Sequence, residues 1–135
     1  MSEPRECIPE GFVRSKFNNT GVDIAAHTVV MLDSTEDYVT LTSATTDPIY
    51  GVAVSGIPDG EWGDVQVMGR AKVLSGAAIA VPGGRVMADN TGRAIDWTAV
   101  AGTNANVLGL CETTASGAAE IVEVELAGPG TISQG

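Results

Sequence analysis

The chain has 135 residues, of which 44% are hydrophobic but only 4% aromatic, and its formal net charge is −10. This charge disfavours binding to nucleic acid or to anionic membranes, because both are negatively charged. Acidic and basic residues balance within residues 1–21, so the acidic excess lies in the rest of the chain. No apolar run reaches the ~20 residues of a membrane-spanning helix, and no secretory signal pattern is present. We therefore expect a domain that contacts neither nucleic acid nor a membrane.

Residues 1–21 are predicted to form an extended N-terminal arm. No hydrophobic periodicity persists there, and residues that break regular structure recur at Pro4, Pro9, Gly11 and Gly21. The arm nevertheless holds both phenylalanines of the chain, Phe12 and Phe17. We therefore expect the arm to pack onto its own body or to dock on a partner.

Residues 22–128 are predicted to form an all-β body. Short apolar or alternating runs follow one another, separated by turn residues, and this pattern is typical of strands. The expected strands are 27–32, 37–42, 49–54, 65–69, 71–74, 85–89, 93–97, 106–112 and 120–127. The best helix candidate, 98–105, is interrupted by Gly102. Residues 129–135 are predicted to form a loose C-terminal tail.

The body contains an internal repeat. The hexapeptide "VMLDST" at 30–35 recurs as "VMADNT" at 86–91, and a strand with a central glycine follows in each copy, at Gly51 and Gly109. Two copies, about 27–72 and 83–128, are too few for a solenoid. They predict a compact β-barrel or sandwich with a pseudo-twofold repeat, in which each copy covers the apolar face of the other. The Asp and Thr of the hexapeptides are expected to shape turns, and the two glycines to allow close strand approach.

The sequence offers no constellation of catalytic, cofactor-binding or metal-binding residues. The single histidine, His27, has no nucleophile signature beside it. Cys111 lies on an apolar strand, where a buried thiol is expected, and Cys7 lies in the arm. The acid-rich loops lack the full calcium-binding pattern. Trp62 stands in a glycine-flanked acidic loop, so it either folds back over the mouth of a barrel or anchors an interface.

Several segments of the body resemble a known family. They are "AAHTVVMLDS", "DPIYGVAVSGIPDGEWGDVQVMGRAKVLSGAAIAVPGG" and the closing "NVLGLCETTASGAAEIVEVEL". They are similar to segments of the capsid decoration, or cement, proteins of tailed bacteriophages, over roughly residues 21–126. The resemblance implies a β-rich subunit on the outer face of a phage head, commonly a trimer or another small oligomer, without catalytic residues. It does not account for the phenylalanine-containing arm.

From the resemblance we expect a protein that is assembled in the host cytoplasm, binds the outer capsid surface and bridges subunits of the major capsid protein. One mechanism would be addition of the arm as a strand to a neighbour's sheet. The expected partner contacts are Phe12, Val13, Arg14, Lys16, Phe17 and Trp62. Two alternatives remain open. One is a glycan- or receptor-binding β-module of the virion surface, and the other is a small trimeric nucleotide hydrolase, whose phosphate-binding motifs are missing.

Overall fold

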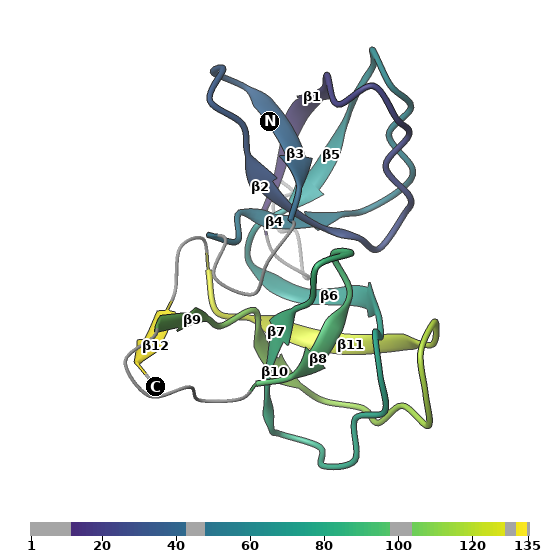
Figure 1. Cartoon of the computed structure of the whole chain (residues 1–135), viewed down its shortest axis with the longest axis vertical. Helices are drawn as coiled ribbons and strands as arrows, with labels where there is room; N and C mark the ends of the chain where they lie inside the picture. Colours follow the sequence, from purple (N-terminus) through teal and green to yellow (C-terminus); the bar gives the residue numbers. More distant parts are fainter. Residues whose placement is uncertain (1–11, 43–47, 98–103, 129–131, 135) are drawn as a thin grey trace, which may run out of the picture.

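The computed structural model describes residues 12–42, 48–97, 104–128 and 132–134. Within these ranges it contains twelve strands and no helix, hence none that could cross a membrane. The all-β prediction is confirmed. Two sets of five strands lie one above the other in Figure 1, beside a small two-stranded sheet. Residues 98–103 of the helix candidate lie outside the described residues, and its last two residues belong to strand β9 (Asn104–Asn106).

The first set is a closed barrel. Its strands are β1 (Val13–Asn18), β2 (Val29–Leu32), β3 (Tyr38–Leu41), β4 (Gly51–Ala53) and β5 (Trp62–Gln66). β1 closes the barrel, because it pairs antiparallel with β5 and parallel with β3. Part of the segment predicted as an arm is therefore a barrel strand, while residues 1–11 lie outside the described ranges. The half-buried Lys16 and the buried Asn18 occupy alternate positions of β1, so no apolar alternation marks this strand in the sequence.

The second set is a five-stranded sheet in the order β6-β11-β10-β7-β8. Its strands are β6 (Gly69–Leu74), β7 (Arg85–Ala88), β8 (Ala94–Asp96), β10 (Gly109–Cys111) and β11 (Ile121–Leu126). A parallel bridge between Ser75 and Ala94 brings the ends of β6 and β8 together. β9 pairs separately with β12 (Ile132–Gln134), which lies in the range predicted as a loose tail.

The two sets repeat the same strand pairing. The barrel order β3-β2-β4-β5-β1 corresponds to the order β8-β7-β10-β11-β6 of the second set. The registers agree, since Val30 lies opposite Gly51 and Val86 lies opposite Gly109. Because β6 takes the place of β1, it is the first strand of the second copy rather than the last strand of the first. We call residues 13–66 the first unit and residues 69–126 the second unit. Each begins one strand earlier than the ranges expected from the sequence.

The repeated hexapeptides shape turns, as predicted. Oδ1 of Asp89 accepts hydrogen bonds from the N–H groups of Thr91 at 2.8 Å and of Arg93 at 3.0 Å. Oδ1 of Asp33 likewise accepts the N–H of Ser34 at 2.7 Å. These side chains take the place of backbone partners and hold the tight return into β3 and β8.

Equivalent positions of the two units also make equivalent contacts. At Gly51 and Gly109 a Cβ atom would collide with a backbone carbonyl oxygen of the neighbouring strand, so the expected close approach is present. A buried polar side chain bonds to a loop at each of two equivalent positions, Asn18 at the end of β1 and Ser75 just after β6. Nδ2 of Asn18 and Oγ of Ser75 each donate to a loop carbonyl oxygen, at 2.8 and 2.7 Å. The repeat therefore extends from topology to individual hydrogen bonds.

The units contact each other through the backbone of residues 27–29. The N–H of Leu74, in β6, donates to the carbonyl oxygen of His27 at 3.1 Å. The N–H of Val29 donates to the carbonyl oxygen of Gly92, which precedes β8, at 2.8 Å. This short segment of the first unit therefore lies between β6 and the chain leading into β8.

In the first unit, no described segment lies between the equivalent strands β1 and β3. The N–H of Phe17 donates directly to the carbonyl oxygen of Asp37 at 2.9 Å, and β1 pairs with β3 at two successive residues. The second unit has a single described bridge, at Ser75 and Ala94, between the same two strand positions. The first unit is closed by its own strands, whereas the second unit is closed partly by the first.

Apolar side chains join the units as well. One buried cluster consists of residues of the first unit and the adjoining Val67, and the other combines residues of the second unit with Val29, Ile49 and Val52 of the first. Full burial of such a side chain contributes about 1.5–3 kcal/mol, against about 1 kcal/mol for a typical hydrogen bond. Shared apolar burial is therefore the larger contribution to the contact between the units.

We expect Gly92→Ala to lower the free energy of unfolding by about 2–5 kcal/mol. Gly92 has a φ of +79°, and a Cβ there would lie 2.7 Å from Cγ2 of Thr28 and 2.8 Å from the carbonyl oxygen of Val29. Gly83→Ala is the matched control, because its φ is +84° and its missing Cβ has open space around it. The control should cost only about 1–2 kcal/mol. Urea unfolding measures both, and equal losses would argue against the contact between the units.

Candidate functional site

The residues predicted as partner contacts fall into two places on the first unit. Phe12 and Val13, 57% and 42% exposed, lie where the chain enters β1, and Arg14 is exposed beside them. Phe17 and Trp62 lie together at the other end of the same strand pair, since they are register partners of β1 and β5. The six predicted residues therefore do not form one continuous surface.

Lys16 differs from the other predicted contacts, because its charge is engaged within the chain. Its side chain is only 15% exposed, and Nζ lies 3.3 Å from Oδ1 of Asp37. Nζ also lies 5.4 Å from the centroid of the Tyr50 ring, a distance at which a cation is attracted to an aromatic face. Lys16 is therefore less free to meet a partner than its place in the sequence suggests.

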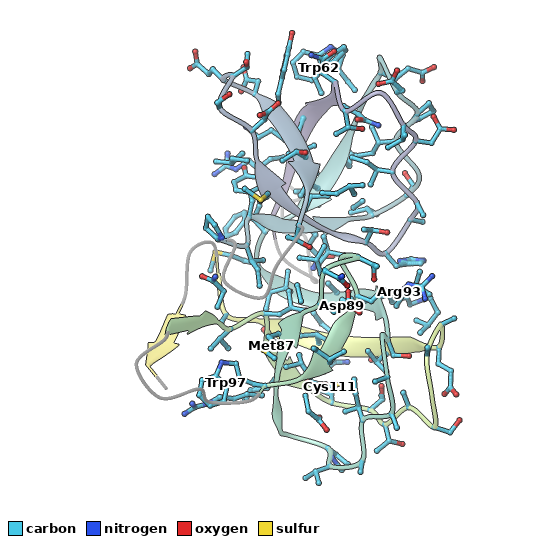
Figure 2. The ribbon with its side chains drawn as sticks, viewed as in Figure 1. Trp62, Met87, Asp89, Arg93, Trp97 and Cys111 are labelled. Carbon is cyan, nitrogen blue, oxygen red and sulfur yellow. The ribbon has the colours of Figure 1, made fainter. Side chains whose placement is uncertain are left out.

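A row of aromatic side chains crosses three neighbouring strands, with Trp62 exposed and Phe17 and Tyr38 half-buried. Phe17 of β1 lies between Tyr38 of β3 and Trp62 of β5, with ring centroids 4.9 and 5.5 Å away. Aromatic pairs at such distances contribute about 0.5–1.5 kcal/mol each beyond their buried area. Trp62 is 56% exposed, at the end of the barrel that points away from the second unit (Figure 2). We call Tyr38, Phe17 and Trp62 the aromatic row.

Tyr38 was not among the predicted contacts. It joins the row through the parallel pairing of β1 with β3, in which Phe17 lies opposite Tyr38. No hairpin connects these two strands, so local sequence does not signal their proximity. The one available sign was the alternation of residues 37–42, which placed Tyr38 on the polar side of its strand.

The second unit carries no counterpart of the aromatic row among its described residues. The equivalent positions hold Leu74, Arg93 and Ile121. Leu74 and the neighbouring Gly92 bond to the first unit, whereas Ile121 is 47% exposed. Part of the surface that stays free in the first unit is thus used in the second for contact between the units.

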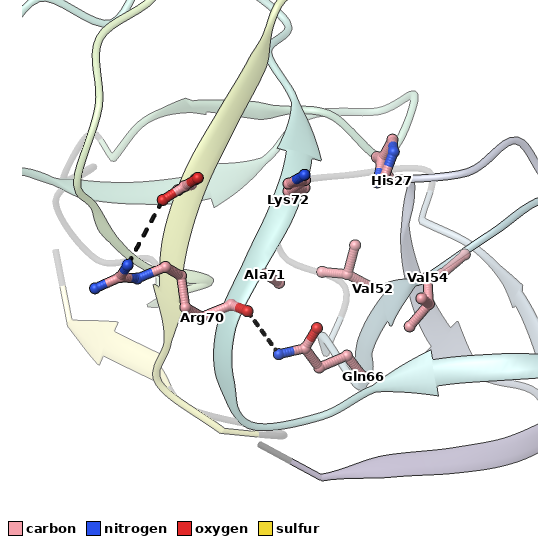
Figure 3. Close-up of a pocket in the computed structure, with 9 residues that line it drawn as sticks. His27, Val52, Val54, Gln66, Arg70, Ala71 and Lys72 are labelled. Carbon is pink, nitrogen blue, oxygen red and sulfur yellow. Dashed lines mark hydrogen bonds and ion pairs between the residues drawn. The ribbon is translucent and has the colours of Figure 1, made fainter. Parts of the chain in front are cut away.

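A groove of about 350 Å³ lies where the two units meet. Its apolar lining comes from β4, the residue after β4, and β6, namely Val52, Ala53, Val54 and Ala71. Its polar lining consists of His27, Gln66, Arg70, Lys72 and Glu123. Figure 3 shows β6 on one side of the groove, with Val52 and Val54 facing it from the first unit. Nε2 of Gln66 reaches across one end and donates to the carbonyl oxygen of Arg70 at 2.8 Å.

The groove offers no hydroxyl or thiol nucleophile. His27 lines it, but none of its lining residues is a serine, threonine or cysteine. Across the part of the chain that the structure describes, no group of three or more His, Cys, Asp or Glu side chains could hold a metal ion. The groove combines apolar side chains, a strand edge and a few charges, which are the features of a peptide-binding surface.

Cys111 lies in the core of the second unit, as its apolar strand predicts. Its side chain is fully buried, and Sγ donates to the carbonyl oxygen of Thr113 at 3.1 Å. Burial raises the pKa of this thiol, because the thiolate would lose its hydration. A thiol that is buried and protonated reacts slowly with external reagents. Cys7 lies outside the described residues.

We expect Cys111 to stay unreactive in a folded Cys7→Ser variant. A raised pKa keeps the thiol protonated at neutral and mildly alkaline pH, and burial excludes the reagent. Absorbance of the thiolate released from an aromatic disulfide reagent measures the reaction, which should follow unfolding as urea is added. A Cys111→Ser variant, which retains Cys7, is the control for reagent activity. Rapid labelling of the folded Cys7→Ser variant would contradict the buried position.

Comparison with known proteins adds to this description of an all-β chain with candidate surfaces. The phage cement protein family matches residues 9–126, most of the chain, and the protein belongs to this family. Among solved structures, it is similar to the N base of the head fiber protein gp8.5 of bacteriophage phi29. The TM-score is 0.64 and the identity 17%, over 86% of this chain and 93% of that chain. At this identity the likeness shows a shared fold. The search of curated proteins finds no match.

Proposed function

We propose that the protein binds the outer surface of a phage head, bridges neighbouring subunits of the major capsid protein and thereby stabilises the shell. Membership of the phage cement protein family supports association with a capsid. The fold shared with a head fiber base supports a position on the outside of the head. The net charge of −10 favours the same side of the shell, because the packaged genome repels an acidic protein.

The aromatic row is the structural observation that links the proposed function to individual residues. Trp62 is exposed at the barrel end, and Phe17 supports its ring. Tryptophan and tyrosine are enriched among the residues that dominate the binding free energy of interfaces. We therefore assign the aromatic row to capsid contact, in a chain in which only 4% of residues are aromatic.

Phe12, Val13 and Arg14 form a second proposed contact, at the other end of β1. Their exposure and their mixture of apolar and basic side chains suit a surface that complements an acidic or apolar patch. Lys16 takes part indirectly in this proposal, since its ion pair with Asp37 supports the neighbouring strand.

Self-association into a trimer or another small oligomer is also part of the proposal. An oligomer engages several capsid subunits at once, and this multivalency raises the apparent affinity without any new contact. The mass of the purified protein, measured by light scattering during size-exclusion chromatography, tests it directly. A monomer at every concentration would remove self-association from the proposal.

We expect Trp62→Ala to weaken capsid binding by roughly thirtyfold, since a central tryptophan of an interface contributes about 2 kcal/mol or more. The measurement is co-sedimentation of the purified protein with capsids that lack it. Ile121→Ala is the matched control, because Ile121 occupies the equivalent position of the second unit and is similarly exposed. Equal binding of wild type and Trp62→Ala would overturn the assignment of the aromatic row.

Removal of residues 1–11 should leave a folded protein, whereas removal of residues 1–20 should unfold it. The longer deletion takes away β1, which pairs with both β5 and β3 and carries the buried Asn18. Circular dichroism and urea unfolding distinguish the two variants, and a stable longer deletion would contradict the role of β1. Capsid binding by the shorter variant would place the contact in residues from Phe12 onward, and loss of binding would place it in the deleted segment.

The glycan-binding alternative rests on the same exposed Trp62, since an indole face can stack on a sugar ring. Binding of the isolated protein to a glycan array, abolished by Trp62→Ala, would favour this alternative. Capsid binding that soluble glycans do not displace would favour the cement function.

A further inference from the structure

Among the described residues, no strand pairs with the edge of β6 that lies along the groove. On its other side β6 pairs with β11 over its full length. The carbonyl oxygen of Arg70 and the N–H of Leu74 both point away from β11, since they bond to the side chain of Gln66 and to His27. Backbone groups of alternate residues in a strand face the same side, so the N–H and carbonyl oxygen of Lys72 also point away from β11. No described residue bonds to either of them.

The open edge is long enough for a short extended segment. A strand rises about 3.3 Å per residue, so the stretch from Arg70 to Leu74 spans about 13 Å, room for roughly three residues. Gln66 and His27 cover its two ends. Val54, which is 43% exposed, lines the groove beside this edge, and the buried Val52 and Ala71 form its floor (Figure 3). An added strand would therefore find backbone partners on one side and the apolar side chain of Val54 next to it.

The charges in the groove favour a carboxylate on the incoming segment. Arg70 is engaged, with its guanidinium 3.0 Å from Glu112 and 3.8 Å from Glu123. Lys72 lies at the middle of the open edge, with Glu123 directly opposite it on β11, and it forms no ion pair within the described ranges. Lysine on an edge also opposes pairing between two copies of the chain, because antiparallel pairing centred there would set one lysine against another. The edge therefore disfavours this pairing of two copies and favours a partner with an acidic side chain near Lys72.

We propose that the groove binds an extended peptide segment that carries an Asp or Glu side chain, as an additional strand on β6. This inference rests on the proposed function, and it assigns the segment to the major capsid protein. Gln66, at one end of the groove, pairs with Val13 of the second proposed contact, and the carbonyl oxygen of Phe12 accepts the N–H of the neighbouring Val67. The segment thus meets backbone groups at Lys72 and a cation at the same residue.

Three substitutions at one position separate the contributions of the edge. Lys72→Glu reverses the charge and should weaken capsid binding by about tenfold or more, whereas Lys72→Gln keeps the N–H and should cost about threefold. Lys72→Pro removes the N–H at an edge position that tolerates proline and should weaken binding more than Lys72→Gln does. Arg93→Glu is the matched control, because it changes the net charge equally outside the groove and should leave affinity within about twofold. Urea unfolding verifies that each variant is folded.

Co-sedimentation with capsids that lack the protein measures affinity, and hydrogen exchange with mass spectrometry measures the edge itself. In the capsid-bound protein, the peptide covering Gly69–Leu74 should gain protection, since the N–H of Lys72 acquires a partner. This second measurement holds even if Lys72→Pro fails to fold. If wild type binds capsids but the Lys72 variants bind equally well and the peptide gains no protection, the groove proposal is wrong and the proposed function stands. If wild type does not bind capsids at all, both are wrong.

Discussion

The insertion of residues 27–29 between β6 and β8 is the contact on which the rest of the structure depends. It lets the second unit complete its closure with backbone from the first, and it brings Val29 into the core that both units share. Two surface features follow from this unequal closure. The first unit closes on itself and leaves Trp62 of the aromatic row exposed, whereas the inserted segment bonds to β6 only near Leu74, and no described residue bonds to the backbone of Lys72 along this edge.

The sequence was informative wherever one short stretch determines its own conformation. The strand-rich pattern, the Asp-based turns and the two glycines with close strand contacts could all be predicted, because each depends on neighbouring residues. The start of each unit could not. The motif Arg-x-Lys occurs in both β1 and β6, yet the pairing aligns Val13, not Arg14, with Arg70. A shift of one residue reverses the face of every side chain. Aligning the two strands by their shared Arg-x-Lys motif would therefore give the wrong register.

The candidate surfaces were predictable only in part, for a related reason. Exposed apolar residues in a polar context pointed to Trp62 and Phe12, but Tyr38 and the edge at Lys72 depend on pairing between strands that are distant in the chain. The two surfaces lie apart, one at the free end of the barrel and one at the junction of the units (Figures 2 and 3). A protein that bridges two capsid subunits needs separate contacts of this kind, and we propose the aromatic row for one contact and the groove for the other.

The unequal closure also determines how far each unit depends on the other. A repeated unit that is closed by its own strands does not depend on the other copy for its backbone partners. The second unit has given up part of that independence, because its strands at Ser75 and Ala94 meet at a single bridge and its remaining partners belong to the first unit. Taken alone, the second unit would lose these partners, so the pair of units is the structural module.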